Sequence, residues 1–197
     1  SAIAGLQEFR KLFPSDDRSA PAYIKIGRLQ QTKGDLDGAF KTFSDAAKKY
    51  SKKNAIYLEA TARAAEVLFE KDKLKNRKTV ERLCSAVLSR FAKYGKDGAK
   101  QPSRIFAAQV AFYVAEYAYH DFMAYTLDTR TFYRLDKSLE EKAKKHQAAE
   151  GKFIKVLDYV SRTWAAAAYY KIGLLYYEFA ETLYAVPMPA GLEQWEE

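Results

Sequence analysis

Few residues in this chain could carry out chemistry, and none are spaced like a known catalytic or metal-binding set. The two histidines, His120 and His146, have no second His or Cys at ligand spacing. Glu116 and His120 lie one helical turn apart and could supply two metal ligands. A third ligand would have to come from elsewhere, and the HExxH spacing is absent. We therefore expect no metal and no cofactor.

Nucleophilic and phosphate-binding patterns are missing as well. The single Cys84 lies in an apolar stripe of helical spacing, which predicts a buried structural thiol. The glycines Gly27, Gly34 and Gly38 are placed as packing and turn residues, not as a phosphate-binding loop. No GxSxG or Cys-His arrangement occurs. The sequence thus predicts that the chain is not an enzyme.

The composition is that of a folded helical protein. Of 197 residues, 48% are hydrophobic and 29% are charged, which suits a single domain with a sizeable core. Only 9 Gly and 5 Pro occur, and this favours long helices with short connections. No run of 18 apolar residues is present, so no membrane span is expected. We expect the chain to be a fragment of a longer protein.

Positive charge is concentrated in the first half of the chain. Residues 1–100 carry 22 Lys and Arg against 12 acidic residues, whereas residues 101–197 carry 11 against 13. A basic half can attract an acidic protein, an anionic lipid surface or nucleic acid. The alternative is an ordinary solvated surface, because many of these bases fall at predicted helix ends.

The elements that must position any site are helices, and residues 20–53 form the clearest pair. Each helix has an apolar face at steps of three and four, and Gly34-Asp35 forms the turn between them. We expect these faces to pack, with small residues where the helices approach closely. The predicted packing residues are Tyr23, Ile26, Gly27 and Gln30 on the first helix, and Leu36, Ala39, Phe43 and Ala46 on the second.

This pair resembles a tetratricopeptide repeat, in which an aromatic residue, an aliphatic-glycine pair and a Gly-Asp turn precede spaced alanines around an aromatic. The resemblance implies an all-α solenoid, here about eight antiparallel helices forming a single domain over residues 1–197. Residues 54–94 and 102–160 read as divergent helix pairs, and residues 163–197 as the start of a further repeat. The segment 94–103, YGKDGAKQPS, is the best candidate for a linker.

The middle of the chain predicts lengthened helices. A heptad-like stripe over residues 131–160 is interrupted by the polar His146 and Glu150. Its expected members are Phe132, Leu135, Leu139, Ala143, His146, Glu150, Phe153, Leu157 and Val160.

A second copy of the repeat pattern follows this stripe. Residues 168–175, AYYKIGLL, match residues 22–29, AYIKIGRL, at six of eight positions. We expect Tyr169, Ile172, Gly173 and Tyr176 to pack as their counterparts do, with Gly173 at a close helix contact like Gly27. Two groups of tyrosines are also expected: core-facing Tyr23, Tyr57, Tyr113, Tyr117, Tyr169 and Tyr176, and groove-lining Tyr119, Tyr125, Tyr177 and Tyr184.

Two further resemblances bear on function. FRKLFPSDDRSAPAY is similar to repeats of bacterial envelope proteins that assist outer-membrane assembly or the Tol-Pal system. TWAAAAYYKIGLLYYEFAETLYAVPMPAGL resembles large deltaproteobacterial tetratricopeptide proteins, some of which belong to a gliding-motility complex. The two resemblances together imply a non-enzymatic scaffold that is periplasmic or associated with the outer membrane. The alternative is a cytoplasmic adaptor whose basic half binds an acidic protein or, less readily, nucleic acid.

In tetratricopeptide proteins the first helix of each pair lines the concave face, so its outward residues meet the ligand. Here these would be Lys25, Arg28, Arg63 and Lys171. All four are basic, which implies a protein or peptide partner that is acidic or presents its C-terminal carboxylate. The alternative is that they are ordinary solvated charges.

Overall fold

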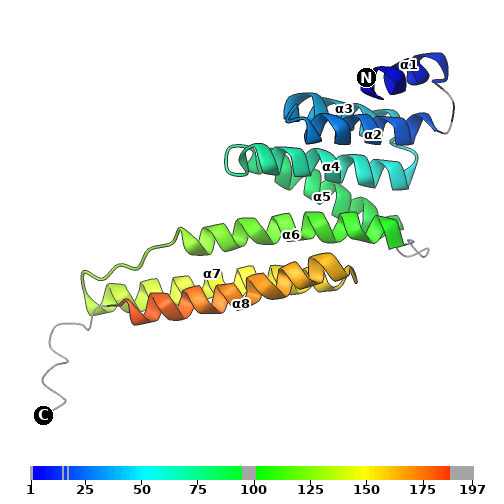
Figure 1. Ribbon diagram of the computed structural model, residues 1–197. Coiled ribbons are helices and arrows are strands. Elements are labelled where there is room, and N and C mark those ends of the chain that lie inside the picture. Colours follow the sequence, from blue (N-terminus) through cyan, green and yellow to red (C-terminus); the bar gives the residue numbers. More distant parts are fainter. Residues whose placement is uncertain (1, 15, 17, 95–100, 187–197) are drawn as a thin grey trace, which may run out of the picture. The chain divides into compact units, whose positions relative to one another are not determined.

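The structure, a computed structural model, describes residues 2–14, 16, 18–94 and 101–186. Within these ranges the chain is all-α, with eight helices and no strand, which confirms the predicted fold class (Figure 1). The helices are α1 (Ala2–Leu12), α2 (Ser19–Thr32), α3 (Leu36–Lys49), α4 (Asn54–Asp72), α5 (Arg77–Tyr94), α6 (Gln101–Met123), α7 (Phe132–Leu157) and α8 (Arg162–Tyr184). Residues 187–197, the end of the segment predicted to start a further repeat, lie outside the described residues.

The chain divides into two compact units, Ser1–Tyr113 and Val114–Glu197. Their boundary falls inside helix α6 and not at residues 94–103, where the composition is that of a linker. Part of that segment lies outside the described residues. Helix α6 contributes to both units, which are called unit 1 and unit 2 in chain order.

Unit 1 is built by packing each helix on the next. Contacts join α1 to α2, α2 to α3, α3 to α4 and α4 to α5, and α2 also reaches α4 (Figure 1). Neighbour-on-neighbour packing of this kind is typical of α-α superhelices, because each helix pair buries an apolar face that it cannot bury alone.

The turn between α2 and α3 depends on two residues. Gly34 has φ +80°, a left-handed conformation that is accessible to glycine at little cost. Asp35 then caps α3, since its Oδ1 accepts a hydrogen bond of 2.9 Å from the backbone N–H of Gly38. The Gly-Asp pair therefore both reverses the chain and starts the next helix, as the sequence predicts.

The contact between α2 and α3 is built around Gly27. A β-carbon at this position would lie 2.5 Å from Cε1 of Phe43, so the ring occupies the space that any side chain would need. Tyr23, Ala39 and Ala46 lie in the same core, and Phe43 is fully buried. Ile26 is also buried. The packing predicted for this pair is thus present.

Unit 2 consists of α7, α8 and the last part of α6. Its core brings together Ala118 and Phe122 of α6, Ala149 of α7 and Leu175 of α8, with Tyr119 and Phe179 packed against them.

The predicted stripe on α7 is wrong over part of its length. Phe132 and Val160 are exposed, whereas Lys142 is buried. Lys142 can lie there because its amine donates a hydrogen bond of 2.9 Å to the carbonyl of Tyr125 and lies 4.6 Å from the centre of the Phe122 ring. The buried residues of α7 still follow steps of three and four: Leu135, Ser138, Lys142, His146, Ala149, Phe153 and Val156.

The second copy of the repeat pattern, on α8, packs differently from the first. Tyr169 and Tyr176 are exposed over 63% and 53% of their surface, and nothing lies within 4 Å of a β-carbon built at Gly173. Ile172 is half-buried. The expectation of a close contact at Gly173 is therefore wrong. The reason is that α8 buries another face, the one that carries Leu175.

These two glycines give a matched test of the packing. We expect Gly27→Leu to lower the free energy of unfolding by about 1–3 kcal/mol, because the new side chain must displace the Phe43 ring. Gly173→Leu should cost nothing and can stabilise α8 slightly, since leucine favours helix more than glycine does. Urea unfolding of both variants measures this. Equal losses at the two positions would contradict the structure.

Candidate functional site

Unit 1 contains a groove between α2 and α4 with a volume of about 420 Å³. This lies at the small end of ligand pockets, which range over roughly 300–1,000 Å³, and suits a few side chains of a peptide. Its walls are mainly apolar, with charged groups among them. The lining residues are Pro21, Ile24, Lys25, Arg28, Leu29 and Thr32 of α2, with Ile56 and Glu59 of α4.

Two predicted ligand-binding bases line this groove. Lys25 and Arg28 are exposed and lie three residues apart on α2, so their side chains emerge from the same face. Neither forms an ion pair or a side-chain hydrogen bond within the described residues. Both cations are therefore available to a ligand carboxylate at the edge of an apolar surface.

Glu59 on the opposite wall belongs largely to an internal network. Burial raises its pKa, and the nearby charges of Arg63 and Arg28 oppose that shift. Its Oε1 lies 4.0 Å from Nε of Arg63. Because the lining carries two cations, Lys25 and Arg28, against this one carboxylate, the groove has a net positive charge.

The other two predicted bases are already paired. Arg63 donates a hydrogen bond of 2.8 Å from Nη1 to Oε2 of Glu66, and only 23% of its side chain is exposed. In unit 2, Nζ of Lys171 lies 2.7 Å from Oε1 of Glu116. Both cations therefore have internal counter-ions, and the structure gathers only Lys25 and Arg28 of the predicted set into one site.

Sequence reasoning missed the apolar wall of the groove. Pro21, Ile24, Arg28 and Thr32 recur at helical spacing on the face of α2 opposite to Tyr23. The sequence signal for this wall is weak, because Arg28 and Thr32 are not apolar and Ile24 also belongs to the core that contains Tyr23 and Phe43. Ile56 and Glu59 of α4 offer no comparable signal, because their place beside α2 depends on the tertiary structure.

The candidate metal ligands are not brought together. Glu116 is the partner of Lys171, and among the described residues no cluster of three or more His, Cys, Asp or Glu side chains could hold a metal ion. Among the same residues, no helix is both long and apolar enough to cross a membrane.

Comparisons of the chain with protein families, curated proteins and solved structures give no match. The functional argument therefore rests on the groove and on the exposed faces of the helices.

The buried His146 is a structural residue of unit 2. Its ring lies against Phe122, Tyr176 and Phe179 at centroid distances of 5.7, 4.6 and 5.1 Å. Its Nε2 has no hydrogen-bond partner among the described residues. Burial lowers the pKa of His146, with Glu150 opposing the shift. An aromatic setting of this kind favours the neutral ring.

The two histidines allow this to be tested. Since the pKa of His146 is lower in the folded chain than in the unfolded one, its neutral form stabilises the fold above about pH 6.5, the usual histidine pKa. That contribution is lost as the pH falls through the lowered pKa. We expect the Tm of the original protein to fall between pH 7.5 and 5.5. In His146→Leu the fall should be smaller, and in His120→Gln it should equal that of the original protein. The same pH response in all three proteins would contradict this.

Cys84 provides a test of the unit 1 core. The residue is fully buried, and burial raises the pKa of its thiol to about 12, with Glu81 adding to the shift. Because the thiolate is the reactive form, labelling by an aromatic disulfide at pH 8 should be slow in the folded chain and stoichiometric in guanidinium. Rapid, complete labelling without denaturant would show that this helix face is open.

Proposed function

We propose that the protein is a non-enzymatic, tetratricopeptide-like scaffold that binds an acidic peptide segment in the groove of unit 1. The observation that carries this proposal is the free pair of Lys25 and Arg28 beside an apolar wall, while Arg63 and Lys171 are neutralised internally. Such a surface recognises an Asp, a Glu or a terminal carboxylate next to an aliphatic or aromatic side chain.

The apolar and charged parts of the groove have different roles in this proposal. The half-buried Leu29 and Ile56 offer surface on which a ligand side chain gains free energy by leaving water. The two cations fix the direction of the peptide and reject basic segments, because like charges at close range repel. Affinity comes mainly from the first contribution and specificity from the second.

We further propose that this scaffold acts in a multiprotein complex of a Gram-negative cell envelope, such as one concerned with motility. The sequence resemblances of FRKLFPSDDRSAPAY and of the α8 region support this assignment. The second candidate is an adaptor that binds an acidic protein or nucleic acid, which the excess of 22 basic over 12 acidic residues in residues 1–100 favours.

Phage-displayed octapeptides selected on the protein provide the test. We expect the selected peptides to combine Asp or Glu with Leu, Ile or Phe. The double variant Lys25→Glu/Arg28→Glu should bind them at least about tenfold more weakly, as expected when a charged contact worth about 1.4 kcal/mol is lost. Fluorescence anisotropy with a labelled selected peptide measures the change.

The matched control is Lys41→Glu/Lys78→Glu, which changes the net charge equally at exposed positions away from the groove. Its affinity should remain within about twofold of the original, the usual scatter for surface substitutions. Equal losses in both double variants would show that only net charge matters. Tight, steeply salt-dependent binding of a labelled single-stranded oligonucleotide would instead support the second candidate.

A further inference from the structure

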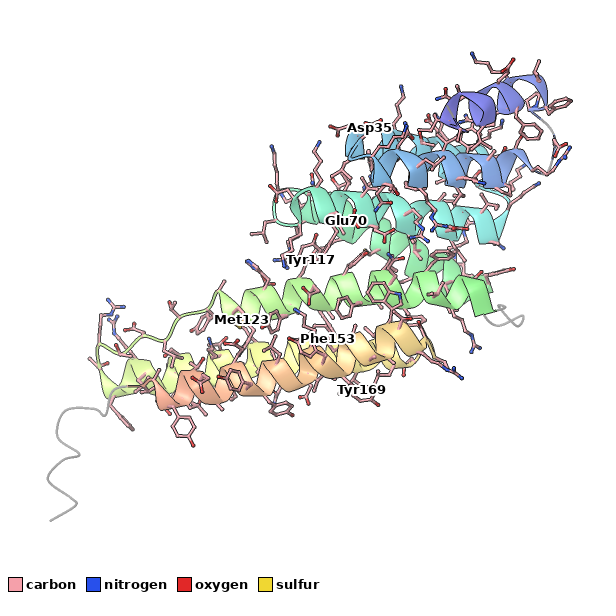
Figure 2. All side chains as sticks on the ribbon, viewed as in Figure 1. Asp35, Glu70, Tyr117, Met123, Phe153 and Tyr169 are labelled. Atoms are coloured by element: carbon pink, nitrogen blue, oxygen red, sulfur yellow. The ribbon has the colours of Figure 1, made fainter. Side chains whose placement is uncertain are left out.

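One face of α8 is covered with exposed tyrosines although the helix lies in a packed unit. Over one arc of the helix, two tyrosine pairs and one further tyrosine follow at seven-residue steps and alternate with small residues. We call this arc the tyrosine face; Figure 2 shows Tyr169 projecting from it. Its members are Tyr169, Tyr170, Tyr176, Tyr177 and Tyr184, with exposed fractions of 63, 69, 53, 59 and 89%, and the small Ala166, Gly173 and Ala180.

The tyrosine face is large for an unoccupied surface. Taking a tyrosine at about 200 Å², these fractions leave roughly 700 Å² of accessible ring surface. The largest apolar patch of a typical monomer is about 300–600 Å², whereas each side of a stable protein interface buries about 800 Å². The face therefore has the size of half an interface.

Helix α2 shows what such a face binds. Aligning the shared octapeptides places three residues of α8 on three of α2. Tyr169 corresponds to Tyr23, Gly173 to Gly27 and, one residue beyond the octapeptide, Tyr176 to Gln30. In α2 these residues are covered by α3. The Phe43 ring fills the space above Gly27, and the Tyr23 and Tyr50 rings meet edge to face at 5.8 Å.

Thr42 of α3 also donates a hydrogen bond of 2.7 Å to Oε1 of Gln30, so the third position of α2 is covered as well. In α8 nothing lies within 4 Å of a β-carbon at Gly173, and Tyr169 is largely exposed. Tyr176 contacts His146 and Glu150 of α7 along one edge and is exposed over the remaining 53% of its surface. Among the described residues of unit 2, no helix therefore fills the space above Gly173 that corresponds to the place of α3 in unit 1.

We infer that the tyrosine face of α8 binds an amphipathic helix of a partner protein that has the chemistry of α3. The partner helix carries an aromatic residue flanked by alanines, in the spacing of Ala39, Phe43 and Ala46. Its aromatic ring enters the space above Gly173, and its alanines allow the two helices to approach closely between the tyrosine pairs.

The residue types indicate a separable partner. Where α2 has Ile24 and Gln31, α8 has Tyr170 and Tyr177. A tyrosine ring can be buried in a contact and yet keep its hydroxyl in water when the partner leaves, which is why tyrosine is frequent at protein interfaces. Tyr176 is already held in place, since its hydroxyl donates a hydrogen bond of 2.6 Å to Oε1 of Glu150. This inference does not depend on the groove of unit 1.

The probe is a fluorescent peptide with the sequence of residues 36–50, stapled between the positions of Lys41 and Asp45, which lie on its outer side. We expect saturable binding to the 197-residue protein in the range of tens of micromolar. Gly173→Leu should weaken it at least tenfold by filling the space for the ring, and Tyr177→Arg should do the same. Replacing Phe43 by Ala in the peptide should have an equal effect.

The matched control is Gly151→Leu, at an exposed glycine of α7 that also has nothing within 4 Å, and it should leave binding unchanged. Lys25→Glu/Arg28→Glu should leave it unchanged too, which separates this result from the groove. Absence of saturable binding, or equal binding by Gly173→Leu, would overturn the inference. So would a dimer in sedimentation equilibrium that Gly173→Leu dissociates, because a second copy would then occupy the face.

Discussion

The close approach of α2 and α3 at Gly27 is the contact on which unit 1 depends. With Phe43 filling the space of the missing side chain, α2 buries Tyr23 and Ile26 against its neighbours. This directs the opposite face of the helix, with Lys25 and Arg28, into the groove beside α4. One glycine-aromatic contact therefore determines both which residues of α2 form the core and which remain exposed in the groove.

The two copies of the octapeptide show how far a local pattern determines packing. For residues 20–53 the sequence predicts the two helices, the Gly34-Asp35 turn and the packing of the helices on each other. This is possible because α3 follows α2 within the same short segment. The same pattern on α8 forms the helix but buries Leu175 and pairs Lys171 with Glu116. Local sequence thus specifies a helix with two apolar faces, and tertiary neighbours decide which of the two is covered.

Where prediction failed, a polar residue had found an internal partner, and sequence spacing reveals that partner in only some of the cases. Lys142 lies inside unit 2 because a loop carbonyl, that of Tyr125, accepts a hydrogen bond from its amine. Arg63 is neutralised by Glu59 and Glu66, which a search for neighbouring acids one turn away could have found. Glu116 is different, since it approaches Lys171 from another helix. Charge alone therefore could not distinguish the exposed Lys25 and Arg28 from the internally paired Arg63 and Lys171.

The two proposed binding surfaces would recognise different chemistry, because their polar groups differ. The groove carries cations, and the tyrosine face carries phenol hydroxyls. The groove has mainly apolar walls, with the exposed cations Lys25 and Arg28 among them. The tyrosine face has no such charges at its centre, and its polar groups are the phenol hydroxyls of the tyrosines. Salt screens the first kind of contact and leaves the second largely unchanged, because ring burial does not depend on charge. A scaffold with both can hold one partner through charge and shape and another through ring burial, without either partner competing for the same chemistry.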